Sequence, residues 1–280
     1  MEKAIKRYFP IFVLPTMIAF TLGFIIPFVE GVYLSFCKFT TVNDAKFIGF
    51  ANYAKVFADE TFVHAFWYTA AFTVVSVILI NVLAFAVALL LTKGFKGTNI
   101  FRTVFFMPNL IGGIVLGYIW QLLLNGILMK FSRTLTYSST FGFWGLVILM
   151  CWQQIGYMMI IYIAGIQNIP GELIEAAEID GATKRQVLKS VTIPMVMPSI
   201  TVCTFLTLTN SFKLFDQNLA LTNGEPSKMS EMLALNIFTT FYGRAGYEGV
   251  GQAKAVIFFI LVAAIALTQN YLTRRKEVQQ

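Results

Sequence analysis

Residues that could catalyse a reaction or bind a metal are few in this sequence. It contains one histidine, His64, and three cysteines, Cys37, Cys151 and Cys203, none of them in CxxC spacing. These residues do not make a metal cluster, and we interpret the cysteines as packing residues. No G-x-x-x-x-G-K-[ST] motif occurs, so the chain has no loop of its own to cradle ATP phosphates. We expect no catalytic residue and no metal site.

Two groups of polar side chains occur in otherwise apolar segments. They are Gln153, Gln154 and Tyr157 in one segment, and Asn210, Lys213 and Asp216 in another. The first three lie within about one helical turn. The second three follow at i, i+3 and i+6, a spacing that predicts one shared helix face. Buried polar groups in lipid are costly unless they bind a ligand or pair with each other, and hydrogen bonds between helices with a Lys213–Asp216 ion pair are the alternative.

The composition requires a membrane around these segments. The chain has 280 residues, of which 57% are hydrophobic and 12% charged, against about a quarter charged in soluble domains. Such a chain exposes too much apolar surface for a soluble globular protein. Six apolar ranges are long enough to cross a bilayer: 8–36, 66–91, 103–124, 141–167, 191–212 and 255–272. Pro15 and Pro27 are expected positions for kinks in the first range.

Basic residues predict the orientation of these spans. With a cytoplasmic amino terminus, the inner segments are 1–10, 93–102, 168–190 and 273–280, and the outer ones are 37–65, 125–140 and 213–254. Lys and Arg are denser in the inner segments, which predicts that both termini are cytoplasmic. The same short clusters account for the net charge of +7 without a nucleic-acid partner. The outer loops 37–65 and 213–254 are rich in aromatic, Asn and Gly residues, which suits either a partner at the outer surface or a simple connection.

The inner segment 168–194 has its own helical pattern. Glu172, Glu175 and Glu178 follow Pro170 at helical spacing, as is typical of a helix start. Gly181 permits a tight turn, and Asp180 or Thr183 can cap a second short helix, while Pro194 marks the start of the next span. Two short helices at a turn form a compact protrusion that fits a groove on another protein. A helix that lies on anionic lipid is the alternative.

The order of residues in this segment decides between these readings. Glu175-Ala176-Ala177 is followed by three residues, Gly181, nine residues and then 191–194 (VTIP). This order resembles the EAA loop of ABC importer permeases, with Val191 and Ile193 in place of Ile and Leu. Three further stretches resemble the carbohydrate-uptake subfamily, and the similarity covers nearly the whole chain: 47–53 (FIGFANY), 101–108 (FRTVFFMP), and 211–216 (SFKLFD) together with 221–226 (LTNGEP).

The resemblance implies an all-α membrane protein with six transmembrane helices in the type I ABC importer permease fold. It implies one permease domain over 1–280, with the EAA loop at 168–194, in a bacterial cytoplasmic (inner) membrane. The implied partners are a second homologous permease, two ATP-binding subunits and an extracytoplasmic sugar-binding protein, besides the lipid bilayer. ATP and Mg would be bound by the ATP-binding subunits, so no cofactor is expected in this chain, which is expected to be a non-catalytic subunit.

Two sets of residues are expected to carry the function. The set that couples to the ATPase, by the same resemblance, comprises Glu175, Ala176, Ala177, Asp180, Gly181 and Ala182. Along the sugar path, the resemblance implies Gln154, Tyr157, Lys213 and Leu214, and the polar groups described above add Gln153, Asn210 and Asp216. Sugars bind to hydrogen-bonding side chains with aromatic faces nearby, which agrees with these residue types.

Two other classes of function are weaker hypotheses. A secondary transporter driven by an ion gradient predicts an inverted repeat, and the hydropathy pattern shows no internal symmetry. A membrane-embedded enzyme or anchor needs a catalytic constellation, which the residues do not supply. The sequence leaves open which sugar is carried, whether the permease pair is made of identical or different chains, and which ATPase is used.

Overall fold

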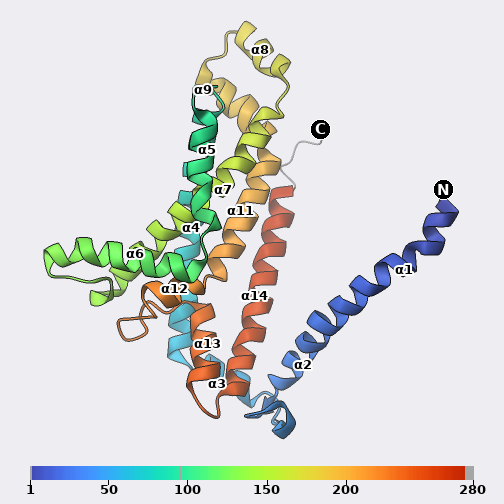
Figure 1. Cartoon of the computed structure of the whole chain (residues 1–280), viewed down its shortest axis with the longest axis vertical. Coiled ribbons are helices and arrows are strands. Elements are labelled where there is room, and N and C mark those ends of the chain that lie inside the picture. Colours follow the sequence, from blue (N-terminus) through green and yellow to red (C-terminus); the bar gives the residue numbers. More distant parts are fainter. Residues whose placement is uncertain (1, 95, 275–280) are drawn as a thin grey trace. The chain divides into compact units, whose positions relative to one another are not determined.

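The computed structural model describes residues 2–94 and 96–274 of the chain. The chain divides into two compact units, Met1–Glu60 with Ile237–Ile260, and Thr61–Asn236 with Leu261–Gln280. Most of the predicted inner segment 273–280, with the basic residues Arg275 and Lys276, lies outside the described residues. Figure 1 traces the elements along the chain.

The described part of the chain is mainly helical, and several helices are long and apolar enough to cross a membrane. Five helical ranges meet this criterion among the described residues: Val13–Leu34, Glu60–Leu91, Gly113–Phe131, Ser139–Gln167 and Glu248–Leu272. The pair Lys184–Met195 and Met197–Phe212 makes a sixth if it is counted as one span bent by 68°. The predicted all-α fold class is therefore confirmed, with differences in the third and fifth ranges.

The third predicted range, 103–124, is not one helix. Helix α5 (Thr98–Phe106) leads into a 3-10 turn at Met107–Leu110, and α6 (Gly113–Leu128) begins after an extended residue, Gly112. Pro108 sits in the first turn of the 3-10 segment, where its missing N–H group and fixed φ are tolerated. The helix long enough to cross a membrane therefore starts ten residues later than predicted, at Gly113.

The fifth predicted range, 191–212, is interrupted at Val196. Helix α9 (Lys184–Val187) precedes the range, and a π-helical segment, Leu188–Thr192, overlaps its start and continues into α10 (Ile193–Met195). Helix α11 (Met197–Phe212) follows with a proline in its first turn. Pro194 and Pro198 both lack the N–H group that a continuous helix needs, which accounts for the bend.

The first unit begins with α1 (Glu2–Phe20) and α2 (Ile26–Leu34), joined by a π-helical turn at Thr21–Ile25. Of the two predicted kink positions, Pro27 lies just after this turn, whereas Pro15 lies within the continuous helix α1. An antiparallel pair of short strands, β1 (Cys37–Lys38) and β2 (Lys46–Phe47), precedes α3 (Ala51–Phe57). Asn52 of α3 is buried and its side-chain Nδ2 donates to the carbonyl oxygens of Ser35 at 2.9 Å and Cys37 at 2.8 Å. This amide ties α3 to the start of the strand pair.

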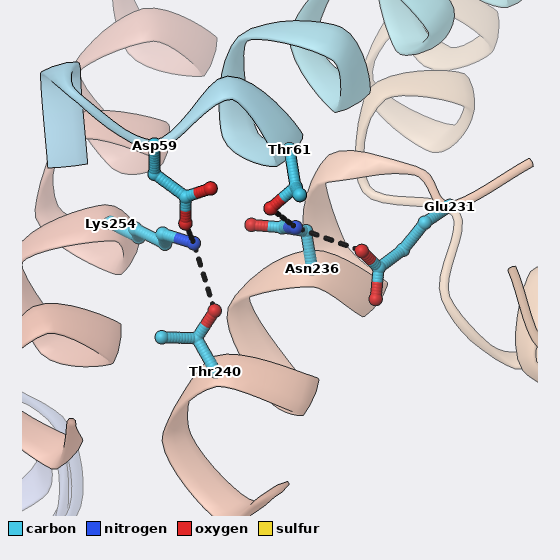
Figure 2. A network of polar contacts seen from close by, with 6 residues as sticks. All are labelled: Asp59, Thr61, Glu231, Asn236, Thr240 and Lys254. Carbon is cyan, nitrogen blue, oxygen red and sulfur yellow. Dashed lines mark hydrogen bonds and ion pairs between the residues drawn. The ribbon is translucent and has the colours of Figure 1, made fainter. Parts of the chain in front are cut away.

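The first unit also contains a buried ion pair (Figure 2). Lys254 lies in α14 (Glu248–Arg274) and is fully buried, and its Nζ is 2.7 Å from Oδ2 of Asp59, which precedes α4. The ammonium group also donates to Thr240 Oγ1 at 2.8 Å, from α13 (Leu233–Gly243). A buried cation needs such partners because its desolvation is costly.

The second unit packs around α7 (Ser139–Gln167), many of whose residues are buried. Its core includes Phe72 and Ile80 of α4 (Glu60–Leu91) with Leu146, Met158 and Tyr162 of α7. The Tyr162 hydroxyl donates to Asn81 Oδ1 at 2.7 Å, and Asn81 Nδ2 donates to Thr207 Oγ1 of α11 at 3.3 Å. These bonds link α4, α7 and α11 across the core.

A second polar cluster, also drawn in Figure 2, connects the loop before α13 to α13 and α4 in the second unit. Glu231 and Asn236 are both buried, and Asn236 Nδ2 donates to Glu231 Oε2 at 2.8 Å. The same Nδ2 donates to Thr61 Oγ1 of α4 at 3.3 Å. The loop therefore has its buried carboxylate hydrogen-bonded rather than isolated, as buried charges require.

A glycine permits a close helix contact in the second unit. A Cβ on Gly156 of α7 would overlap the backbone carbonyl of Phe105 in α5. Because backbone atoms have no rotamer with which to move away, we expect Gly156→Ala to lower the free energy of unfolding by about 1–3 kcal/mol. The thermal midpoint of the detergent-purified protein measures this change.

Gly126→Ala is the matched control for this prediction. Gly126 also lies within a helix, α6, but nothing is within 4 Å of a Cβ built there. We expect the control to unfold at the midpoint of the parent protein. Equal midpoints for Gly156→Ala and Gly126→Ala would contradict the proposed close contact.

Candidate functional site

The predicted coupling segment forms two short helices joined by a tight turn. Helix α8 (Gly171–Ile179) begins after Pro170, which occupies the N-cap position rather than the first helical turn. Gly181 adopts φ +80°, the left-handed conformation that glycine adopts freely. Of the two predicted caps for the second helix, Thr183 is the one used: its Oγ1 accepts from the Gln186 N–H in a capping box. Figure 1 shows α8 and α9 beyond the end of α7.

The six predicted coupling residues are distributed over this turn. Glu175, Ala176 and Ala177 belong to α8, Asp180 is at its C-cap, and Gly181 and Ala182 make the turn. Sequence reasoning did not single out Ile179, which is 85% exposed at the end of α8. An isoleucine at the tip of an exposed helix suits insertion into an apolar groove. Its position at the end of the acidic helix, directly before Asp180 and Gly181, was the available signal.

The second unit also contains a polar cavity of about 280 Å³ between α7 and the residues that follow α11. It is lined by Met150, Gln154, Asn210, Lys213, Leu214, Phe215, Asp216 and Gln217. Five of the seven residues predicted for the solute path therefore lie around one space: Gln154, Asn210, Lys213, Leu214 and Asp216. The cavity gathers amide, ammonium, carboxylate and aromatic groups, the set that can bind a polyhydroxylated ligand.

The reason these residues meet differs from the predicted one. Asn210, Lys213 and Asp216 do not share a helix face, because α11 ends at Phe212 and α12 (Asp216–Leu221) starts after a turn. The turn, rather than a helical repeat, brings them to the cavity. Lys213 and Asp216 form no ion pair within 4 Å of each other in the described structure. The structure therefore does not contain the Lys213–Asp216 ion pair that was the alternative to a solute site.

Gln153 and Tyr157 do not line this cavity. The Gln153 amide binds other parts of the protein: its Oε1 accepts from Gln217 Nε2 at 2.8 Å, and its Nε2 donates to the Ile111 carbonyl at 3.3 Å. The ring centroids of Tyr157 and Phe106 are 6.4 Å apart. Gln153 thus holds Gln217, a cavity residue that sequence reasoning missed.

The Gln154 side chain, unlike that of Gln153, has an unpaired acceptor. It is 8% exposed, and its Oε1 is buried without a hydrogen-bond partner in the described part of the chain. An unpaired buried acceptor costs about 1–3 kcal/mol, so it is poised to bind a ligand donor. Of the two adjacent glutamines, only Gln154 has an amide group free for a solute.

Comparison with known proteins identifies the family. The chain belongs to the family described as binding-protein-dependent transport system inner membrane component, whose model matches residues 80–278. It is 42% identical, over 96% of its length and 94% of the relative's, to the probable starch degradation products transport system permease protein AmyD of Thermoanaerobacterium thermosulfurigenes. It is 28% identical, over 99% of both chains, to the multiple sugar-binding transport system permease protein MsmF of Streptococcus mutans. The predicted family is confirmed.

A solved structure shows the same fold. A chain of a bacterial ABC transporter involved in the import of the acidic polysaccharide alginate superposes with a TM-score of 0.82 at 22% identity, covering 98% of each chain. The permease fold is thus confirmed as a multi-pass membrane architecture. The roles of the coupling segment and of the cavity residues remain predictions.

Proposed function

We propose that this chain is the transmembrane permease subunit of an ATP-driven, binding-protein-dependent sugar importer. The observation that carries the proposal is the polar cavity, where Gln154, Asn210, Lys213 and Asp216 meet between apolar helices. Its relatives carry names of permeases for starch degradation products and for multiple sugars. Starch degradation products are therefore the solutes to test first.

The cavity provides half of the solute path. Its hydrogen-bonding groups bind hydroxyls, and Phe215 and Leu214 supply apolar contact with a sugar ring. The volume of about 280 Å³ is at the lower limit of small-molecule pockets. A second homologous permease completes the path, as the type I importer architecture implies.

The coupling segment transmits movement from the ATPase subunits. The exposed helix α8, with Glu175, Ala176 and Ile179, enters a cleft on an ATP-binding subunit. That subunit binds ATP and Mg, while this chain is non-catalytic. ATP and the loaded binding protein shift the permease between inward-open and outward-open states by binding one state more tightly.

The outer loops of the first unit receive the sugar-binding protein. Phe47 and Phe50 are 66% and 74% exposed, next to Tyr53 and Phe36 in a ring cluster. Exposed aromatic groups of this kind are typical of protein interfaces. In the proposed orientation these loops face outward from the bacterial cytoplasmic membrane, and both termini are cytoplasmic.

ATP hydrolysis by the reconstituted complex tests this function. The complex contains this chain, its second permease, the ATPase and the binding protein, and it is assayed with a panel of sugars that includes malto-oligosaccharides. We expect one class of sugar to stimulate hydrolysis in the presence of the binding protein. Unchanged hydrolysis with every sugar on the panel would contradict a sugar importer.

Gln154→Leu tests the cavity as part of the solute path. Removal of the amide group deletes one hydrogen bond to the solute, and we expect the KM for the stimulating sugar to rise about tenfold. The thermal midpoint should not fall, because Gln154 Oε1 binds no described group in the unliganded protein. The sugar dependence of ATP hydrolysis gives the KM.

Gln153→Leu is the contrasting variant. It leaves Gln217 Nε2 and the Ile111 carbonyl without their partner, so we expect a lower thermal midpoint. The assignment of Gln154, and not Gln153, to the solute path would be contradicted by two results. One is a rise in KM for Gln153→Leu as large as that for Gln154→Leu, and the other is an unchanged KM for Gln154→Leu.

A further inference from the structure

A second cavity in the same unit lies where three helices end. Helix α4 ends at Leu91, α5 begins at Thr98 and α7 ends at Gln167, and the space of about 440 Å³ between them shares no residue with the polar cavity described above. Its polar lining comes from Thr92, Gly94, Gly97, Thr98, Asn99, Arg102 and Gln167.

Arg102 is the charged group of this cavity. Its guanidinium forms no ion pair or hydrogen bond with any described residue, and its Nε is buried without a partner. None of the described residues that line the cavity is acidic. Arginine stays protonated in proteins, and its planar set of donors matches a phosphate or carboxylate. The cavity thus holds a cation without its anion.

The residues around the cavity indicate which kind of anion it binds. Leu91 and Ile100 line it beside the polar groups, and Ile100 is 69% exposed. Lys93 and Lys96, both exposed, belong to the loop between α4 and α5. An exposed apolar side chain, a half-buried arginine and nearby lysines at the ends of membrane helices are the features of a lipid headgroup site.

We propose that this cavity binds the phosphate group of an anionic phospholipid, with Arg102 as its main ligand. The acyl chains then extend along the exposed apolar side chain of Ile100. The inference goes beyond the proposed transport function and does not depend on which solute is carried. Since Gln167 lies four residues before α8 starts at Gly171, a bound lipid braces the base of the coupling segment.

Lipid binding to the purified full-length permease tests the proposal. The detergent-purified protein is titrated with phosphatidylglycerol or with phosphatidylcholine of the same acyl chains, and bound lipids are counted by native mass spectrometry. We expect one phosphatidylglycerol per permease to bind at least about tenfold more tightly than phosphatidylcholine. Arg102→Gln should lower the phosphatidylglycerol affinity about tenfold, through loss of one charge-assisted contact, and Arg102→Lys should retain part of it.

Lys189→Gln is the matched control. Lys189 is an exposed cation in another of the predicted inner segments, 168–190, and it does not line the cavity. We expect this variant to bind phosphatidylglycerol as the parent does. Equal binding by Arg102→Gln and the parent overturns the proposal. Displacement of the lipid by millimolar inorganic phosphate reassigns the cavity to free phosphate, and displacement by the ATPase subunit reassigns Arg102 to a protein interface. If Arg102→Gln does not fold, equal affinity of the parent for the two lipids still refutes the site.

Discussion

Replacement of Gly181 by valine is expected to reduce sugar-stimulated ATP hydrolysis about thirtyfold. Gly181 has φ +80° in the turn between α8 and α9, and a β-branched residue is strained in this region by about 2 kcal/mol. A penalty of that size changes a conformational population about thirtyfold. The turn then loses the geometry that presents α8 to the ATPase, while the solute cavity is unchanged. Hydrolysis by the reconstituted complex, with and without sugar, measures the loss.

Gly171→Val is the matched control for the coupling turn. Gly171 belongs to the same segment and is exposed, its Cβ position is also free of neighbours, and its φ is not in the left-handed region. We expect this variant to retain stimulated hydrolysis within about threefold, in line with the small helix-propensity difference. Equal losses in the two variants would show that bulk in the segment, and not the backbone conformation at Gly181, controls coupling.

Replacement of Asp59 by asparagine is expected to lower the free energy of unfolding by about 3–5 kcal/mol. The change removes the negative charge 2.7 Å from the fully buried Lys254 ammonium. A buried charge without a counter-charge has this cost, because the desolvation of the ammonium is no longer offset. Thr240 still accepts a hydrogen bond, so the expected loss lies nearer to 3 kcal/mol. Chemical unfolding of the detergent-purified protein measures the change.

A double-mutant cycle separates the charge from the shape of this site. We expect Asp59→Asn combined with Lys254→Met to recover most of the lost stability, since no charge remains buried. Asp44→Asn is the control, because Asp44 is an exposed carboxylate of the same unit that accepts from the backbone N–H groups of Thr40 and Thr41. Additive losses in the double variant would rule out a coupled ion pair.

Local sequence chemistry was sufficient to predict the two short helices and the turn of segment 168–194, while their coupling role came from the resemblance. Gly181 and Thr183 act through their own backbone and the next few residues, so a turn and a cap are visible without knowledge of the fold. The long apolar ranges were predictable for the same reason. The breaks at Gly112 and Val196 were not, since a proline in an apolar range is compatible with either a kink or a chain break.

Contacts between distant segments account for what sequence reasoning missed. Asp59 and Lys254 are 195 positions apart, and nothing local indicates that they pair. Gln153 was expected on the solute path, but its amide binds Gln217, 64 positions away. Asn210, Lys213 and Asp216 were grouped correctly from a helical spacing that does not exist, because α11 ends at Phe212. Residue type indicated the chemistry of the site, and only the fold shows which groups are free.

Uptake by proteoliposomes tests the central proposal most directly. Vesicles that contain the assembled complex are given labelled malto-oligosaccharide, with the binding protein outside and either ATP inside or a proton or sodium gradient. We predict uptake that requires both ATP and the binding protein, persists when ion gradients are abolished, and is lost in Gly181→Val. Uptake without ATP that follows an ion gradient would contradict the proposal and identify a secondary transporter.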